Sequence, residues 1–116
     1  MFKKVSKDIK QLAKIAVLAA EDKKAKDVLT LDISNLSTIA DFFIVCSASN
    51  PIQAQAIANN IEEKMSEEGL ALLRKEGYNN ANWILLDYGD IVAHIFQEED
   101  RWFYNLEQLW GDAPAV

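Results

Sequence analysis

The stretch NWILLDYGDIVAHIF, residues 82–96, decides how the sheet of this protein is built. An apolar run meets a polar corner, and a second apolar run follows it. The corner consists of Asp87, Tyr88, Gly89 and Asp90. Because glycine adopts the backbone angles that a tight turn needs, the pattern predicts two strands, residues 83–88 and 91–97, joined as an antiparallel hairpin.

Three further strands are expected before this hairpin or beside it. Residues 27–34, DVLTLDIS, alternate between apolar and polar side chains, which predicts a strand with one buried face. Residues 41–48, DFFIVCSA, form an almost continuous apolar run, which is typical of a central strand covered on both faces. Residues 70–78, LALLRKEGY, predict one more strand.

Three helices complete the expected order. Apolar residues recur at helical spacing over residues 3–24, with lysines between them. Asn50 can cap a second helix, Pro51 suits its first position, and Gln53 completes an approximate capping box. That helix is expected to stop at Gly69. The segment EEDRWFYNLEQLW, residues 98–110, predicts the last helix.

The expected architecture is a single α/β domain over residues 1–116, in the order α-β-β-α-β-β-β-α. The length suits one domain, and half of the residues are apolar, so a substantial core is expected. Strands that alternate with helices in this way predict a mixed sheet flanked by helices.

Charge is spread unevenly along the chain, whose net charge is −6. Residues 1–26 hold eight lysines and three acidic residues, a balance of +5. Residues 27–116 hold four basic and 15 acidic residues, a balance of −11. An acidic body repels nucleic-acid phosphates and suits a basic protein partner better. An acidic balance that only maintains solubility is an equally good interpretation.

The location that we expect is the cytoplasm, with no membrane span. The longest apolar runs are far shorter than the roughly 20 residues of a membrane helix. The first residues lack the apolar block and cleavage site of a secretory signal. Cys46, the single cysteine, cannot form an internal disulfide, which favours a reducing compartment.

Signs of enzyme chemistry are weak in this chain. It contains neither GxGxxG nor a P-loop, and one histidine with one cysteine makes a zinc site improbable, so we expect no metal and no cofactor. Cys46 lies in an apolar strand, where cysteine usually packs as an inert residue. His94 shares a strand face with Val92 and Phe96 and is expected to be packed and hydrogen-bonded rather than a general base.

Asp87 and Asp90 are the best catalytic candidates. Nucleotidyl transfer commonly uses two carboxylates at alternate positions of one strand, which face one pair of metal ions. Here the carboxylates stand three residues apart and flank a turn, so a simple hairpin turn is the stronger interpretation. A metal-dependent nucleotidyltransferase that uses Asp87, Asp90 and Asp41 remains the alternative function.

Aromatic residues gather in the last third of the chain. They are Trp83, Tyr88, Trp102, Phe103, Tyr104 and Trp110. Most aromatic residues in a small domain belong to its core, but tryptophan, tyrosine and arginine also anchor protein interfaces. Arg101 stands beside Trp102 in a region poor in basic groups. The pattern favours a protein-binding surface with aromatic anchors and an acidic rim.

Three segments together resemble the ribosomal silencing factor family, also called Iojap or RsfS. They are DFFIVCSASN…QAIA, EG…ANWILLDYGDIVAHIF and RWFYNLEQLWGDAP. The resemblance extends from the first helix through Pro114. It implies a translational repressor that binds the large ribosomal subunit on the face that meets the small subunit. There it would dock on large-subunit ribosomal protein fourteen and block subunit joining during starvation or stationary growth.

The resemblance also implies a nucleotidyltransferase-like fold without that activity, and a possible homodimer. The partner-binding residues that it implies are Trp83, Leu85, Asp87, Tyr88, Gly89, Asp90, His94, Arg101 and Tyr104. Trp83 and Tyr88 would act as aromatic anchors, with Asp87 and Asp90 as acceptors for basic groups on the partner. Pairing of Arg101 with one of these aspartates, and a core position for Leu85, are the alternatives.

Two residues depart from the family pattern, and one segment stays without a role. Ala48 replaces a common glycine, which calls into question a positive φ at that turn. Asn50 replaces a frequent serine, and both residues cap helices well. The lysine-rich first helix leaves open a third function, an RNA-binding adaptor, although a solvated helix face is the simpler interpretation.

Overall fold

A computed structural model describes residues 8–35 and 40–98 of the chain. Within these ranges the chain forms two helices and five strands, and the predicted mixed α/β architecture is confirmed. The elements are α1 Ile9–Asp22, β1 Lys26–Asp32, β2 Phe42–Ala48, α2 Pro51–Glu67, β3 Arg74–Glu76, β4 Trp83–Asp87 and β5 Ile91–Gln97. The helix predicted for residues 98–110 lies outside the described residues, apart from its first position.

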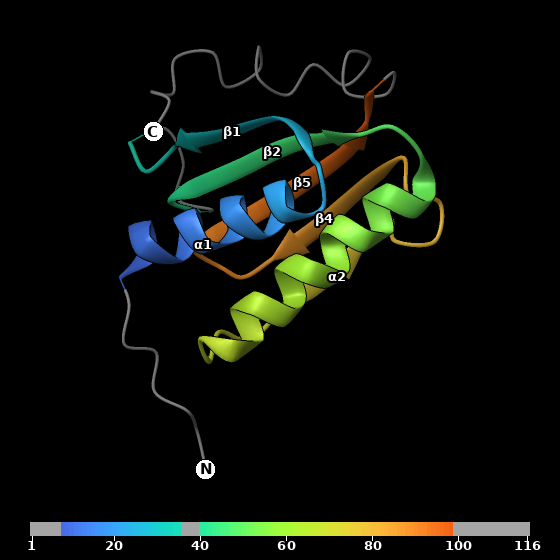
Figure 1. Cartoon of the computed structure of the whole chain (residues 1–116). Coiled ribbons are helices and arrows are strands. Elements are labelled where there is room, and N and C mark those ends of the chain that lie inside the picture. Colours follow the sequence, from blue (N-terminus) through green and yellow to red (C-terminus); the bar gives the residue numbers. More distant parts are fainter. Residues whose placement is uncertain (1–7, 36–39, 99–116) are drawn as a thin grey trace.

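The five strands form one sheet in the order β1-β2-β5-β4-β3 (Figure 1). Strands β2 and β5 pair in parallel, and every other neighbouring pair is antiparallel. The predicted hairpin is confirmed, because β4 and β5 pair antiparallel across the turn at Gly89. Strand β5 therefore occupies the centre of the sheet, with two strands on each side.

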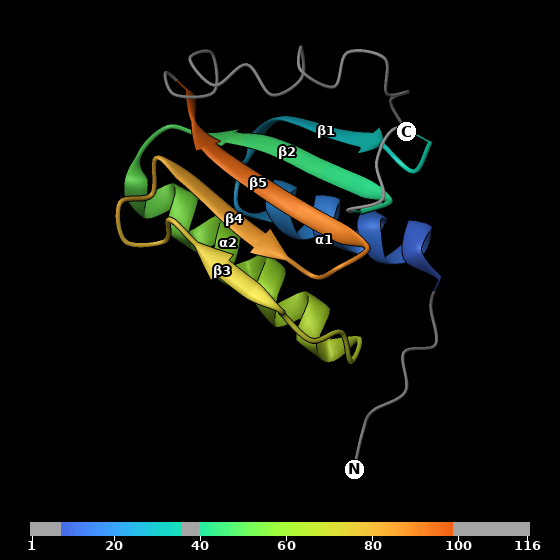
Figure 2. The ribbon, with the colours of Figure 1, turned by 180° about the vertical axis from the view of Figure 1, so that it is seen from behind.

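Both helices lie on one face of the sheet. In Figure 1 they stand in front of the strands, and Figure 2 shows the strands in front of the helices. Side chains of α1 and α2 pack with Ile44, Ile84 and Ile95 into the larger core cluster. The opposite face carries no helix from the described part of the chain, and a second cluster forms there around Phe43, Val45 and Phe96.

Local capping explains where the two helices begin. The Asp8 carboxylate accepts the backbone N–H of Gln11, and the Gln11 side chain accepts the N–H of Asp8, so α1 starts with a full capping box. The predicted helix began near residue 3, and residues 3–7 are not among those described. Asn50 caps α2 as predicted, and its side-chain oxygen accepts the N–H of Gln53.

Gln53 differs from the predicted capping box. Its side-chain oxygen accepts the N–H of Ser49, one residue before the cap. Its side-chain amide donates to the carbonyls of Lys23 and Lys24, which directly follow α1. Because the end of one helix leaves carbonyl groups unpaired, Gln53 can satisfy two of them and join the two helices.

The strand predicted at residues 70–78 is shorter than expected, because only Arg74–Glu76 pair with β4. Before it, the N–H of Leu70 bonds to the Met65 carbonyl at the end of α2, so this segment still belongs to the helix cap. After it, Gly77 has a φ of +75° and lies against the Trp83 backbone, where a Cβ would not fit. Both ends of the strand are therefore set by neighbouring backbone.

Ala48, where the family commonly has glycine, is the last residue of β2 and pairs with Gln97 of β5. Ala48 is absent from the described residues with positive φ and is fully buried in the larger core cluster. A glycine is therefore not required at this position, and the departure from the family pattern is accommodated by the strand.

Candidate functional site

The turn between β4 and β5 is held by its own backbone and by Asp87. The N–H of Tyr88 donates to the Ile91 carbonyl at 2.8 Å, and the N–H of Gly89 donates to the Asp87 carboxylate at 2.8 Å. Gly89 has a φ of +91°, so the predicted need for glycine is confirmed. The Asp90 carbonyl accepts the N–H groups of Asp41 and Phe42, which fixes the turn against the start of β2.

Trp83 and His94 form a well-defined polar contact on the face of the sheet opposite α1 and α2. The indole N–H of Trp83 donates to Nδ1 of His94 at 3.0 Å. The imidazole is therefore in the tautomer with its proton on Nε2, and this atom is buried without a hydrogen-bond partner among the described residues. Burial lowers the pKa of His94 to about 4, against a smaller opposing effect of the Asp87 charge.

Aromatic rings pack around this pair. The Phe43 ring meets His94 edge to face, with 4.6 Å between the centroids. Trp83 stacks on Phe96 at 5.0 Å. These contacts confirm that His94 is a packed, hydrogen-bonded histidine on the same face as Val92 and Phe96. They also fix the orientation of the Trp83 side chain, because its ring is stacked and its N–H is bonded.

The β4 residues on this face are partly exposed, whereas those of β5 and β2 are buried. Trp83, Leu85 and Asp87 follow one another at alternate positions, each half-buried. A hollow of about 360 Å³ lies beside Trp83 and Leu85, and its other walls come from the segment around Gly77 and Asn80. This row presents an apolar surface with a carboxylate at one end.

Arg74 was not among the residues predicted for the site. Its guanidinium lies 3.9 Å from the Asp87 carboxylate and 2.8 Å from that of Glu76. The register of β3 on β4 sets Arg74 directly opposite Asp87. Sequence reasoning looked for an arginine near Asp87 and named Arg101, which lies outside the described residues, as does Tyr104. Only knowledge of the strand pairing could have identified Arg74.

Tyr88 lies apart from Trp83. Its side chain is 6% exposed and belongs to the core cluster on the helix-covered face. It lines a cleft with Glu62, Asn59 and Ser66 of α2, and burial together with the Glu62 charge raises the pKa of its hydroxyl. The two aromatic anchors predicted for one patch are thus on opposite faces of the sheet. A partner contact of Tyr88 stays a prediction.

The arrangement of carboxylates offers no evident metal centre. The Asp87 carboxylate accepts the N–H of Gly89 and forms an ion pair with Arg74, and Asp90 is exposed on the turn. Within residues 8–35 and 40–98, no three His, Cys, Asp or Glu side chains gather as metal ligands. Cys46 is buried in the core cluster. In the same ranges, no helix has both the length and the apolar character to cross a membrane.

Comparison with known proteins gives consistent matches. The model of the family described as "Ribosomal silencing factor during starvation" matches residues 6–116. The ribosomal silencing factor RsfS of Bacillus subtilis is 45% identical over 107 residues, which cover 92% of this chain and 91% of that protein. The corresponding protein of Halalkalibacterium halodurans is 46% identical over 106 residues, which cover 91% of each chain.

A solved structure agrees with these matches. The crystal structure of a protein from Chromobacterium violaceum superimposes with a TM-score of 0.89 at 35% identity. The similarity covers 90% of this chain and 88% of the other. At that identity and coverage, sequence and fold point to the same set of relatives.

Proposed function

The chain belongs to the ribosomal silencing factor family, and we propose that it represses translation by occupying the large ribosomal subunit where the small subunit joins. The observation that carries the proposal is the family match over residues 6–116. The family and its relatives are named as silencing factors, which is the name of a regulatory protein rather than of an enzyme. Repression by occupancy needs no turnover, because a bound protein excludes the second, larger partner by its volume.

The partner that we propose is large-subunit ribosomal protein fourteen, and the docking surface is the β4 row with the adjoining turn. Trp83 and Leu85 supply apolar area beside a hollow of about 360 Å³. A half-buried aromatic residue next to a hollow is the kind of position where binding energy concentrates. Exposed Asp90 and partly exposed Asp87 would accept basic groups of the partner.

The remaining predicted residues have supporting places in this proposal. Gly89 shapes the turn, and His94 holds the indole of Trp83 through its Nδ1. Tyr88 packs beneath the turn, so we propose that it supports the surface from the core. Arg101 and Tyr104 follow β5 in the chain and keep their predicted roles at the partner surface.

The setting that we propose is the cytoplasm during starvation or stationary growth. The family description names starvation, when blocking subunit joining would spare the energy of protein synthesis. A homodimer is part of the proposal, and sedimentation of the purified protein at several concentrations tests it. No sequence-specific contact to nucleic acid is needed, since the proposed contacts are made to a ribosomal protein.

Co-sedimentation tests the proposed binding. Purified protein is mixed with isolated large subunits, isolated small subunits or joined ribosomes, and each mixture is run through a sucrose gradient. We expect migration with large subunits only, and loss of it in Trp83→Ala. Ile52→Ala is the control, because Ile52 is an apolar side chain exposed on α2, on the other side of the sheet. Equal binding by a folded Trp83→Ala variant would exclude the docking surface.

Charge reversal tests whether binding depends on the acidic turn or on the overall negative charge of the protein. Asp90→Lys should weaken binding to large subunits, because like charges would then meet at the interface. Glu63→Lys makes the same change at an exposed site on α2 and should leave binding intact. If both reversals weaken binding equally, the overall charge and not this surface determines it.

Titration of subunit joining tests the mechanism. With a fixed amount of large subunits, the fraction of joined ribosomes should fall in proportion to added protein and level off at one protein per large subunit. Strong inhibition by a small fraction of that amount would indicate turnover and contradict repression by occupancy.

A further inference from the structure

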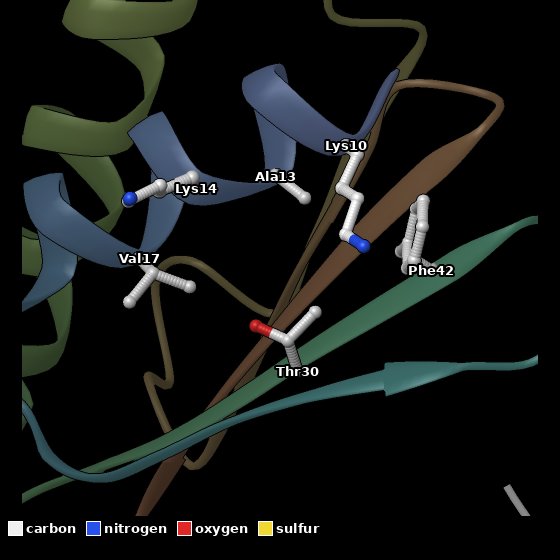
Figure 3. A pocket seen from close by; sticks show the side chains of 6 residues that line it. All are labelled: Lys10, Ala13, Lys14, Val17, Thr30 and Phe42. Atoms are coloured by element: carbon white, nitrogen blue, oxygen red, sulfur yellow. The ribbon is translucent and has the colours of Figure 1, made fainter. Parts of the chain in front are cut away.

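A cavity of about 330 Å³ lies between α1 and the sheet, away from the proposed docking surface. Its walls are Ala13 and Val17 of α1, Thr30 of β1 and Phe42 of β2, with Lys10 and Lys14 at the helix side (Figure 3). The cavity is open to solvent on the side of Lys10 and Lys14, which are both exposed. The volume falls at the lower end of the range for small-molecule sites, about 300–1,000 Å³.

The walls of the cavity are largely apolar side chains of α1 and of the sheet. Ala13 is 2% exposed and contributes only a methyl group to the wall. The Lys10 side chain extends from α1 toward the sheet, with its ammonium group beside the Phe42 ring (Figure 3). Most of the lining is therefore hydrocarbon, which favours an apolar occupant.

The polar side chains that line the cavity are all hydrogen-bond donors. The Lys10 ammonium extends toward the sheet beside Phe42, whereas the Lys14 ammonium points away from it at the rim (Figure 3). The Thr30 side chain is 9% exposed and its hydroxyl points toward α1 (Figure 3). It forms no hydrogen bond with another described residue. Neither Lys10 nor Lys14 forms an ion pair within residues 8–35 and 40–98. One hydroxyl and two ammonium groups all donate hydrogen bonds to an anion.

Asp32 limits how much negative charge the cavity can accept. Hydrogen bonds from Ser34, and to a smaller degree the charge of Lys10, hold the pKa of Asp32 below its usual value. Its carboxylate is therefore ionised and attracts Lys10, the same lysine that an incoming anion would contact. A singly charged head group is favoured over a doubly charged phosphate, because repulsion grows with charge.

We propose that this cavity binds a small amphipathic monocarboxylate, with its aliphatic tail between α1 and the sheet and its carboxylate toward Lys10 and the Thr30 hydroxyl, while Lys14 adds positive charge at the rim. The volume, the hydrocarbon walls and the hydrogen-bond donors each favour this class of ligand. The inference is independent of ribosome binding, since none of these residues belongs to the proposed docking surface.

Nuclear magnetic resonance titration with sodium octanoate tests the proposal on the full chain. We expect saturable shifts of the backbone amides of Ala13, Val17 and Thr30. Octan-1-ol has the same tail without the charge and should bind more weakly. Absence of saturable shifts at these amides would overturn the proposal, and equal affinity for both compounds would overturn the role of the lysines.

Two kinds of variant locate the ligand. Val17→Trp should fill the cavity and abolish binding, whereas Leu18→Trp places the same side chain on the outer side of α1 and should bind as wild type does. Lys10→Glu with Lys14→Glu should weaken octanoate binding by about tenfold, since the ion pair with Lys10 is lost and the rim of the cavity becomes negatively charged. Because both lysines are exposed, this variant tests the proposal even if Val17→Trp does not fold. Unchanged affinity in it would contradict the site.

Discussion

The two faces of the sheet are built from the same strands but with different chemistry. On the helix-covered face, Ile84, Leu86 and Ile95 are fully buried against α1 and α2. On the other face, the same two strands present Trp83, Leu85 and His94, with stacked rings and an indole–imidazole hydrogen bond. Strand alternation separates these sets completely, because successive side chains point to opposite faces.

The difference indicates that one face of the sheet stabilises the fold and the other is suited to recognition. Aliphatic side chains between helices and sheet stabilise the fold through burial, and many apolar side chains of similar volume would serve there. A tryptophan whose ring is stacked and whose N–H is bonded has one orientation, which is a property that a recognition surface needs. The following variants test this division, in order of decreasing expected effect.

Ile95→Ala should cause the largest loss of stability. Its side chain is fully buried on the helix-covered face, and such truncations cost about 2–5 kcal/mol of the free energy of unfolding. Urea denaturation measures it. Ile52→Ala is the matched control, because Ile52 is 79% exposed and its truncation should change stability by less than about 0.5 kcal/mol. Similar losses in both variants would contradict the assignment of Ile95 to the core.

Acidification should destabilise the protein through His94. Burial lowers the pKa of this side chain to about 4 in the folded protein, so the unfolded chain binds the proton first as pH falls. The contribution of neutral His94 is complete above pH 6.5 and is lost between about pH 6.5 and 4, on the order of 3 kcal/mol in total.

His94→Gln provides the comparison for this pH dependence, since its amide oxygen can still accept from Trp83. Denaturation at a series of pH values should show a flatter slope for the variant in that window. Carboxylates titrate in both proteins, so the difference between the two slopes reports the histidine. Identical slopes would mean that His94 is not held neutral by burial.

Trp83→Phe should cost about 1–3 kcal/mol, because it keeps an aromatic ring but leaves Nδ1 of buried His94 without its donor. A double-mutant cycle with His94→Leu measures the coupling from four unfolding free energies. We expect a coupling energy of about 1 kcal/mol. Additive effects would show that the hydrogen bond does not connect the two side chains in solution.

Gly89→Ala should have a smaller effect than the core and Trp83 substitutions, a loss of about 1–2 kcal/mol. The φ of +91° strains any residue with a Cβ, and that atom would lie 3.3 Å from the Leu73 side chain. The turn joins β4 and β5, and both strands contribute side chains to the two faces of the sheet. The loss of stability should therefore appear equally in far-ultraviolet circular dichroism and in tryptophan fluorescence. Asp90→Ala next to it should change stability little, because Asp90 is exposed.

Much of this fold could be predicted from local pattern. The hairpin at Gly89, the cap at Asn50 and the buried run at residues 42–48 are each encoded within a few neighbouring residues, and each is confirmed. The strand at residues 70–78 was predicted too long, because its ends depend on the α2 cap and on the Trp83 backbone. The bridging role of Gln53 also depends on α1, which is distant in sequence.

The sequence by itself determined the type and order of the helices and strands that the structure describes, the family and the residue types of the candidate site, because periodicity, capping and motif order are local properties of the chain. Alternation along one strand already places Tyr88 and Trp83 on opposite faces. Only the tertiary structure decided that α1 and α2 cover the face of Tyr88, and that Arg74 rather than a later residue lies beside Asp87 among the described residues. The physical reason is register: pairing between strands sets which distant residues meet, and local pattern does not specify it.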